Sequence, residues 1–203
     1  MPTNGNLSDF EGSLINEMGR DFLLKRYVDA VKGNYDFILI DCQPSTNVLT
    51  INALVAANSV LIPTQAEEYS QDGIDKMRFL CRKIKDSGMN ATLGIEGVLF
   101  TMWDRQTKYA QRYKAEIIER CADLNVFEPM IPYTVRMREA NEAGVSIFKY
   151  DPHSKATAPF EQIGKEIIER ERKRQEGRNK FRKLVPGGGA RTGGKKPYCH
   201  ASH

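Results

Sequence analysis

Apolar and polar positions alternate along the chain in a pattern that predicts helices and strands in turn. Apolar residues between Leu7 and Val31 recur near helical spacing, which predicts one long helix. The nearly continuous apolar run Tyr35–Asp41 is typical of a strand that is buried on both faces of a parallel sheet. Further strands are expected at Ser59–Pro63, Ile95–Met102 and Val126–Ile131, and further helices at 48–57, 71–85, 109–121, 136–143 and 158–183.

This order of elements predicts the fold class. Strands that alternate with helices at this spacing form βαβ units, so we expect an α/β fold with a mostly parallel sheet flanked by helices. Ligands of such sheets bind at the carboxyl ends of the strands. The residues that directly follow the apolar runs are therefore the candidates for function, namely 41–45, 64–67, 103–105 and 132–133.

Composition excludes several classes of protein. The chain has 203 residues, of which 40% are hydrophobic and 28% charged, as in an ordinary globular domain. No run approaches the roughly 18 apolar residues of a membrane-spanning helix, and the first residues do not resemble a secretory signal. The four cysteines form no C-x-x-C pair, so we expect reduced thiols in a cytoplasmic protein.

The charges are distributed unevenly. Residues 170–203 hold eleven Lys and Arg against two Asp and Glu, whereas residues 1–169 carry a net charge of −5. Such a basic segment can bind nucleic acid or another polyanion, or it can be a solvated extension. Residues 184–203 include three consecutive glycines, two prolines and scattered Lys and Arg, with little that could pack, which predicts disorder. We therefore expect an α/β domain over 1–170 and a basic tail over 171–203 that is helical at first and then disordered.

Asp41 is the strongest single candidate for chemistry. An apolar run that ends in an aspartate and a Pro-Ser turn has the form of a Walker B element, whose carboxylate holds Mg²⁺ through a water beside nucleotide phosphates. The pattern is equally typical of an aspartate that caps the next helix or ends a strand. A glycine-rich loop with a lysine, which would cradle the phosphates, would favour the Walker B interpretation of Asp41. The nearest match, Gly189–Lys196, ends in lysine instead of a hydroxyl, and Pro197 follows where a helix should begin.

Basic residues near the strand ends form a second set of candidates. Arg105, Lys108 and Arg112 are spaced so that a helix would place them on one face, and Arg136 follows the last predicted strand. Such a face suits contacts to nucleic-acid phosphates. A solvated helix face has the same spacing, so the pattern leaves both interpretations open.

Several segments together resemble the ParA family of DNA-partitioning ATPases, and they occur in the order and at the spacing of that family. The resemblance extends from about Pro2 to Arg170. Its segments are YDFILIDCQPS at 35–45, LTINALVAANSVLIP at 49–63, GVLFTMWD at 97–104, IPYTVRMREA at 131–140, and Tyr150, Asp151, Pro152 and Ser154.

The resemblance implies a P-loop NTPase fold of the deviant-Walker type and ATP-dependent dimerisation around Mg-ATP. It also implies non-specific DNA binding, a ParB-like partner and a cytoplasmic, nucleoid-associated location without a membrane. Asp41 would then be the catalytic, Mg²⁺-side acid, and Met102 and Pro132 would line the adenine pocket. The residues expected to meet DNA phosphates are Arg105, Lys108, Arg112, Arg136 and the basic tail.

The sequence also departs from the family pattern. The 203 residues include no counterpart of the family's lysine-bearing phosphate loop, which implies a version truncated at the N-terminus. Gln106 and Tyr133 stand where the family often has arginine, and Gln43 stands where it usually has proline. We expect a partition protein that neither binds nor hydrolyses Mg-ATP alone, as a homodimer or as a heterodimer with a full-length ParA-like protein. The alternatives are a non-catalytic module that pairs with such a protein or with DNA, and the product of a truncated gene without a role.

Overall fold

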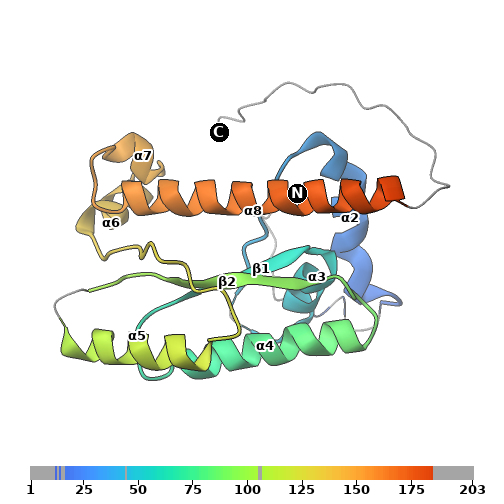
Figure 1. Cartoon of the computed structure of the whole chain (residues 1–203), viewed down its shortest axis with the longest axis horizontal. Helices are drawn as coiled ribbons and strands as arrows, with labels where there is room; N and C mark the ends of the chain where they lie inside the picture. The colour runs from blue at the N-terminus through green and yellow to red at the C-terminus, as the bar shows by residue number, and fades with distance from the viewer. Residues whose placement is uncertain (1–11, 13, 15–16, 44, 105–106, 185–203) are drawn as a thin grey trace. The chain divides into compact units, whose positions relative to one another are not determined.

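The structure is a computed structural model that describes residues 12, 14, 17–43, 45–104 and 107–184, with side chains up to residue 177 (Figure 1). The chain divides into two compact units, 1–160 and 161–203. The first unit holds a parallel sheet and its helices, and the second begins inside the last helix. Among the described helices, none combines the length and the apolar character that crossing a bilayer requires.

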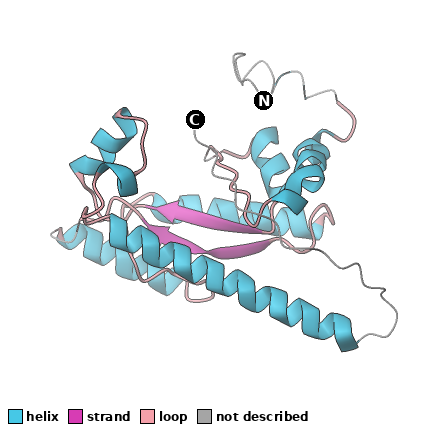
Figure 2. Cartoon of the chain, turned by 90° about the horizontal axis from the view of Figure 1, so that it is seen from above, coloured by secondary structure: helices cyan, strands magenta, loops and turns pink. Residues whose placement is uncertain are grey.

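The sheet is parallel, as the sequence predicts (Figure 2). Strands β1 (Ser59–Thr64) and β2 (Gly94–Phe100) pair from Ser59↔Gly94 to Thr64↔Phe100. On the other side of β2, the predicted strand 126–131 makes only isolated parallel bridges, Val98↔Val126 and Trp103↔Pro132. The spatial order is therefore β1, β2 and the segment 126–132, which confirms an α/β fold with a parallel sheet.

A local irregularity in β2 explains why a glycine stands at position 97. The register steps from Val60↔Ile95 to Leu61↔Gly97, so β2 carries one extra residue at this point. Gly97 has φ +154°, and a Cβ there would lie 2.6 Å from the carbonyl oxygen of Asn125. Only glycine lets the two backbones approach closely enough for the Val98 N–H to donate to that same oxygen at 2.8 Å.

Helices occur along the chain near the positions that the periodicity predicts. Asn47 begins α3, because its side chain accepts a hydrogen bond from the Thr50 N–H at 3.0 Å. Leu184 is the last residue of α8, and the segment 185–203, for which disorder is predicted, lies outside the described residues. The helices that follow Asn47 in the described chain are α3 (Val48–Ala56), α4 (Ser70–Asp86), α5 (Lys108–Arg120), α6 (Val135–Glu142), α7 (Ile147–Tyr150) and α8 (Thr157–Leu184).

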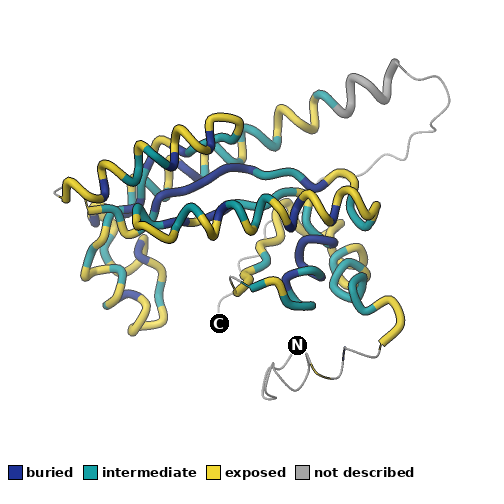
Figure 3. The backbone as a smooth tube through the Cα atoms, turned by 90° about the horizontal axis from the view of Figure 1, so that it is seen from below, coloured by how far each residue is buried: buried dark blue, intermediate teal, exposed yellow. Residues whose placement is uncertain are grey.

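The core lies between the strands and the helices that pack on them (Figure 3). One cluster joins β1 and β2 to α4 and α5, where Val98, Phe100 and Ile117 are fully buried. A second cluster joins α3 and α4 around Leu93. Burial of these side chains is the main favourable contribution to folding, and it fixes the ends of the strands in space.

The N-terminal region differs from the prediction of one helix over Leu7–Val31. The described residues form a short 3₁₀ turn η1 (Arg20–Phe22), then α2 (Leu23–Val31) and a second turn η2 (Lys32–Asn34). Gly19 precedes them with φ +70°, a left-handed conformation that a continuing helix cannot accommodate. The apolar residues follow helical spacing, but the backbone conformation of Gly19 interrupts the helix.

The prediction of a buried strand at Tyr35–Asp41 is wrong. Residues 35–43 belong to no ladder, the Leu39 side chain is 94% exposed, and Tyr35 is 64% exposed. No backbone N–H of 36–41 donates a hydrogen bond to any described residue. An apolar run becomes a buried strand only where a neighbouring strand satisfies its backbone, and no described strand lies beside this one.

Candidate functional site

The ends of β2 and of the segment 126–132 are joined directly. The Trp103 N–H donates to the Ile131 carbonyl at 2.9 Å, and the Tyr133 N–H donates to the Trp103 carbonyl at 3.1 Å. Met102 and Pro132, which the resemblance assigns to one pocket, therefore lie at neighbouring strand ends. Met102 is 59% exposed and has φ +50°, a conformation that is costly for a residue other than glycine.

Two helices begin close to this junction. Lys108 opens α5 a few residues after Trp103, and α6 begins shortly after Pro132. The Thr134 hydroxyl caps α6 by accepting from the Arg136 N–H at 3.2 Å. Both first turns therefore lie at the carboxyl end of the sheet, where Figure 1 shows the start of α5 and all of α6.

The cations predicted to contact nucleic acid differ in their partners. The Arg112 Nε donates to Glu116 at 2.7 Å, and this hydrogen bond raises the pKa of the Arg112 guanidinium. The Arg136 guanidinium donates to Glu139 at 2.9 Å, and that bond raises the pKa of Arg136.

A weaker contact joins Arg136 to Asp151 at 3.7 Å. Lys108 is exposed and forms no ion pair with any described residue. Arg105 lies outside the described residues, so the predicted set of four cations is only partly visible. Of the three that are described, Lys108 is the one whose charge is not already neutralised by a carboxylate.

Asp41 lies in the exposed segment rather than at the end of a sheet strand. Its side chain makes no hydrogen bond or ion pair with the described residues. Asn47 caps α3, so the alternative in which Asp41 caps that helix is wrong. The nearby polar groups bond to one another: the hydroxyls of Ser45 and Thr50 are 3.2 Å apart, and Thr50 donates to the Gln43 carbonyl at 3.4 Å.

The residues around Asp41 do not by themselves fit Mg-ATP. They offer one carboxylate and the hydroxyls of Ser45 and Thr46, and no glycine-rich loop with a lysine adjoins them in the described chain. Elsewhere in the described part of the chain, no cluster of three or more His, Cys, Asp and Glu side chains could hold a metal ion. Binding a triphosphate requires several backbone N–H groups and a cation, so no catalytic step follows from these residues.

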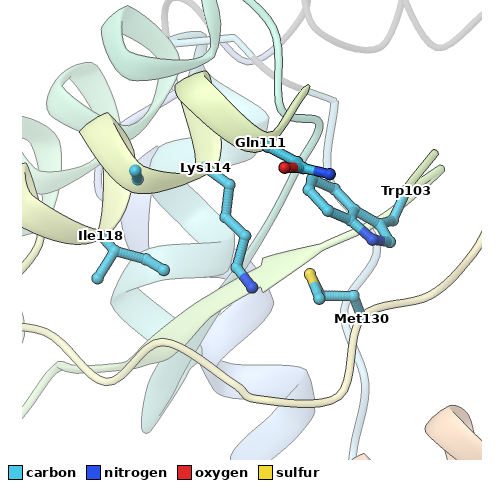
Figure 4. A pocket seen from close by; sticks show the side chains of 6 residues that line it. Trp103, Gln111, Lys114, Ile118 and Met130 are labelled. Carbon is cyan, nitrogen blue, oxygen red and sulfur yellow. The ribbon is translucent and has the colours of Figure 1, made fainter. Parts of the chain in front are cut away.

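A pocket beside the strand ends was missed by the sequence reasoning. It has a volume of about 700 Å³ and lies between α5 and the segments around Trp103 and Met130 (Figure 4). The Lys114 ammonium lies 5.5 Å from the centroid of the Trp103 ring, a cation–π distance. The available signal was the spacing of the α5 residues, which places them on one helix face. The lining residues are Trp103, Gln111, Lys114, Ala115, Ile118 and Met130.

Comparisons with known proteins agree with the fold. A family model described as "AAA domain" matches residues 1–95. A solved structure of cobyrinic acid a,c-diamide synthase from Mycobacterium smegmatis, with bound ATP analogue and magnesium, is similar with a TM-score of 0.58. It is 32% identical, and the match covers 64% of this chain and 52% of that one.

Two curated relatives are more closely related in sequence. The chromosome-partitioning ATPase Soj of Treponema pallidum is 37% identical over 174 residues, which is 86% of this chain and 68% of the relative. The sporulation initiation inhibitor protein Soj of Bacillus subtilis is 38% identical over 167 residues, 82% of this chain and 65% of the relative. The chain thus spans about two thirds of the length of these relatives. From these matches and the parallel α/β fold, we conclude that the chain belongs to the ParA family of chromosome-partitioning ATPases.

Proposed function

We propose that this chain acts in DNA partitioning by binding DNA phosphates at the carboxyl end of its sheet, and that it does not hydrolyse ATP alone. The observation that carries the proposal is the Trp103↔Pro132 bridge. This bridge brings together the strand ends from which α5 and α6 begin. In a member of the ParA family, it gathers cations and two helix N-termini at one edge.

The electrostatics of this edge suit a polyanion. Helix N-termini and exposed cations both attract phosphate. Lys108 can contribute its full charge, whereas Arg112 and Arg136 must exchange a carboxylate for a phosphate. Arg105 and the basic tail complete the proposed DNA-binding set from the sequence. Because such contacts read the backbone and not the bases, binding should not depend on DNA sequence.

The proposed DNA contact can be tested by the salt dependence of binding. Fluorescence anisotropy with a random 30-base-pair duplex gives the slope of log K against log salt, about −0.9 per phosphate contact. Lys108→Gln should reduce the slope by about one contact, and Lys76→Gln on the exposed face of α4 should not. Deleting 171–203 measures the contribution of the basic tail to DNA binding. If Lys108→Gln and Lys76→Gln leave equal slopes, the proposed edge is wrong.

The proposal about ATP rests on the sequence around Asp41. Phosphoryl transfer depends on groups that position and neutralise the phosphates, and this chain provides no lysine-bearing loop for them. In this proposal Asp41 holds Mg²⁺ through a water, and Met102 with Pro132 lines the adenine site, only when a segment outside residues 1–203 supplies that loop. Calorimetry and phosphate release with Mg-ATP should both give blank values. Release that Asp41→Ala abolishes would contradict the proposal.

One observation favours a second candidate, a non-catalytic module that pairs with a full-length ParA-like protein. The segment 35–41 exposes apolar side chains, and the N–H groups of 36–41 bond to no described residue, so a partner chain can satisfy both. Co-purification of the tagged chain with a full-length relative should then be lost in Leu39→Asp. Retention of the partner by Leu39→Asp would exclude this surface.

The remaining partners are proposed because the chain belongs to the ParA family. A ParB-like protein and a second copy of this chain are the expected protein partners. Gel filtration with light scattering, with and without the ParB-like protein of the same organism, distinguishes monomer, dimer and complex. A fluorescently tagged chain should coincide with the nucleoid in cells, and an even distribution through the cytoplasm would contradict DNA binding in vivo.

A further inference from the structure

We propose that the pocket between α5 and the strand ends, lined by Trp103, Lys114 and Met130, binds a small aromatic anion. The lining includes neither Asp41 nor any of the residues proposed to contact DNA, and neither proposed function requires the pocket. Its volume of about 700 Å³ lies in the range of about 300–1,000 Å³ that is usual for small-molecule sites.

The walls of the pocket select a planar, apolar group. Figure 4 shows the indole of Trp103 and the thioether of Met130 on one side and Ile118 on the other, all directed at the same space. An indole ring stacks on or meets the edge of another aromatic ring, and a methionine sulfur also makes favourable contacts with ring edges. Ile118 is 40% exposed, so a bound ring would remove its apolar surface from water.

The single cation in the lining sets the sign of the ligand's charge. Lys114 is held by the face of the Trp103 ring and has no carboxylate partner among the described residues. Its neighbours on α5 differ in this respect, since Arg112 pairs with Glu116 and Arg120 pairs with Asp75. The anionic group of a bound ligand would therefore contact the Lys114 ammonium, whose charge no carboxylate among the described residues compensates.

Together these features define the ligand as a ring that carries a carboxylate or a similar anionic group. The amide of Gln111 lies at the same rim (Figure 4). A neutral aromatic compound would use the walls and leave the ammonium unmatched. A cation would be repelled by Lys114, so the pocket should discriminate by charge as well as by shape.

The pocket can be tested with a matched pair of probes, indole-3-acetate and indole-3-acetamide, which share a ring and differ in charge. Trp103 is the only tryptophan of the chain, so its indole N–H gives one signal in the ¹⁵N spectrum of the labelled full-length protein. We expect indole-3-acetate to shift this signal saturably. The amide should bind about fivefold more weakly, the effect of one exposed charge contact.

Three variants make the result specific. Lys114→Gln should lower the affinity for the acetate to that for the amide, while the affinity for the amide stays unchanged. Lys108→Gln, a matched loss of charge on the same helix outside the pocket, should change neither. Ala115→Met keeps a strong helix former but fills the pocket, and should abolish both shifts. Unchanged spectra away from the pocket confirm that each variant is folded.

Several results would overturn the proposal. One is the absence of a saturable shift with indole-3-acetate up to about 10 mM, a concentration at which even a weak small-molecule site is occupied. Equal affinity for the acetate and the amide would show that Lys114 does not select charge. A loss in Lys108→Gln as large as that in Lys114→Gln would show non-specific attraction to a basic helix.

Discussion

Two apolar runs of the sequence differ in burial and in strand pairing. The run 35–41 is exposed and belongs to no ladder, with Leu39 at 94% exposure, whereas β2 over Gly94–Phe100 ends in a Phe100 side chain that is fully buried. β2 has β1 on one side and the bridging segment 126–132 on the other. It is also covered by α4 and α5, from which Ile74 and Ile117 meet Phe100 in one cluster.

The difference shows that hydrophobic pattern alone does not bury a strand. A buried strand requires partners for its backbone N–H and C=O groups as well as a surface for its side chains. β2 has both, so its apolar residues contribute free energy to folding. In the segment 35–41, the N–H groups of 36–41 have no partner among the described residues and most side chains are exposed, so the segment adds little to stability. The predictions that follow test this contrast.

Hydrogen exchange should show the largest difference between the two regions. Amides of 36–41 have no hydrogen-bond acceptor in the described chain, whereas those of Val98, Phe127 and Ile131 donate to neighbouring strand segments at 2.8–2.9 Å. We expect the second group to exchange at least about 1,000-fold more slowly, since core amides open only in large unfolding events. Exchange measured by NMR at neutral pH checks this, and equal protection in both groups would contradict the contrast.

A matched pair of leucine substitutions should give the next largest effect. Leu93 is 1% exposed in the cluster of α3 and α4, so Leu93→Ala should cost about 2–5 kcal/mol of unfolding free energy. Leu39→Ala removes the same atoms from an exposed side chain and should change stability by less than about 0.5 kcal/mol.

Urea denaturation of both variants against the unchanged chain provides the measurement. The slope of the unfolding free energy with urea should stay the same in each variant, because neither change alters the area exposed on unfolding. If Leu39→Ala costs as much as Leu93→Ala, then 35–41 is buried in solution. That result would require a strand partner for this segment.

The leucine pair also marks the limit of what the sequence could predict. The periodicity correctly predicted α3, α4, α5 and both strands of the sheet, because each of these elements finds its neighbours within the described chain. The strand at 35–41 was predicted from the same kind of signal and is wrong, because the signal contains no information about a neighbour. The break at Gly19 was missed, since a glycine within a helical pattern does not reveal its own φ.

The candidate site was predictable in part for a similar reason. Pro132 could be found by reading where its apolar run stops, whereas Met102 was assigned through the resemblance to the family. The pairing of Arg112 with Glu116 could have been anticipated from their spacing of four residues. The contact of Lys114 with Trp103 could not, because it depends on how α5 packs beside the strand end.

Glycine substitutions distinguish a required glycine from a tolerated one within the ordered region. At Gly97 a Cβ would lie 2.6 Å from a backbone oxygen, and φ is +154°. Gly97→Ala should therefore cost about 1–3 kcal/mol. Gly73→Ala on α4 meets nothing within 4 Å and should gain about 0.5–1 kcal/mol from helix propensity. Thermal unfolding of both variants tests this, and losses of similar size would show that the close approach at Gly97 is absent.

Asn90 links α3 to the turn before β2 and should give a smaller loss. Its side-chain amide donates to the carbonyls of Leu54 at 2.9 Å and of Ala57 at 2.7 Å, near the end of α3. Asn90→Ala should cost about 1–2 kcal/mol because these acceptors lose their donor. Thr92→Ala removes only an exposed hydrogen bond to Asn90 and serves as the control. Equal effects of the two changes in urea denaturation would show that the amide does not hold α3.

The smallest effect belongs to the N-terminal region, where α2 has no buried residue and Asp29 forms exposed ion pairs. The Lys32 ammonium donates to the Asp29 carboxylate at 2.7 Å and, with a contribution from Lys25, lowers the pKa of Asp29 below 3.8. Because the pKa of Asp29 is lower in the folded than in the unfolded state, its ionised carboxylate stabilises the helix at pH values above the unfolded pKa. This stabilisation is lost as the pH falls through the folded pKa. Lys32→Gln should raise the pKa of Asp29 towards 3.8, as measured by NMR titration, and should leave the stability of the β1–β2 region unchanged. If that stability changed, the exposed ion pair of Asp29 would stabilise more than its own helix.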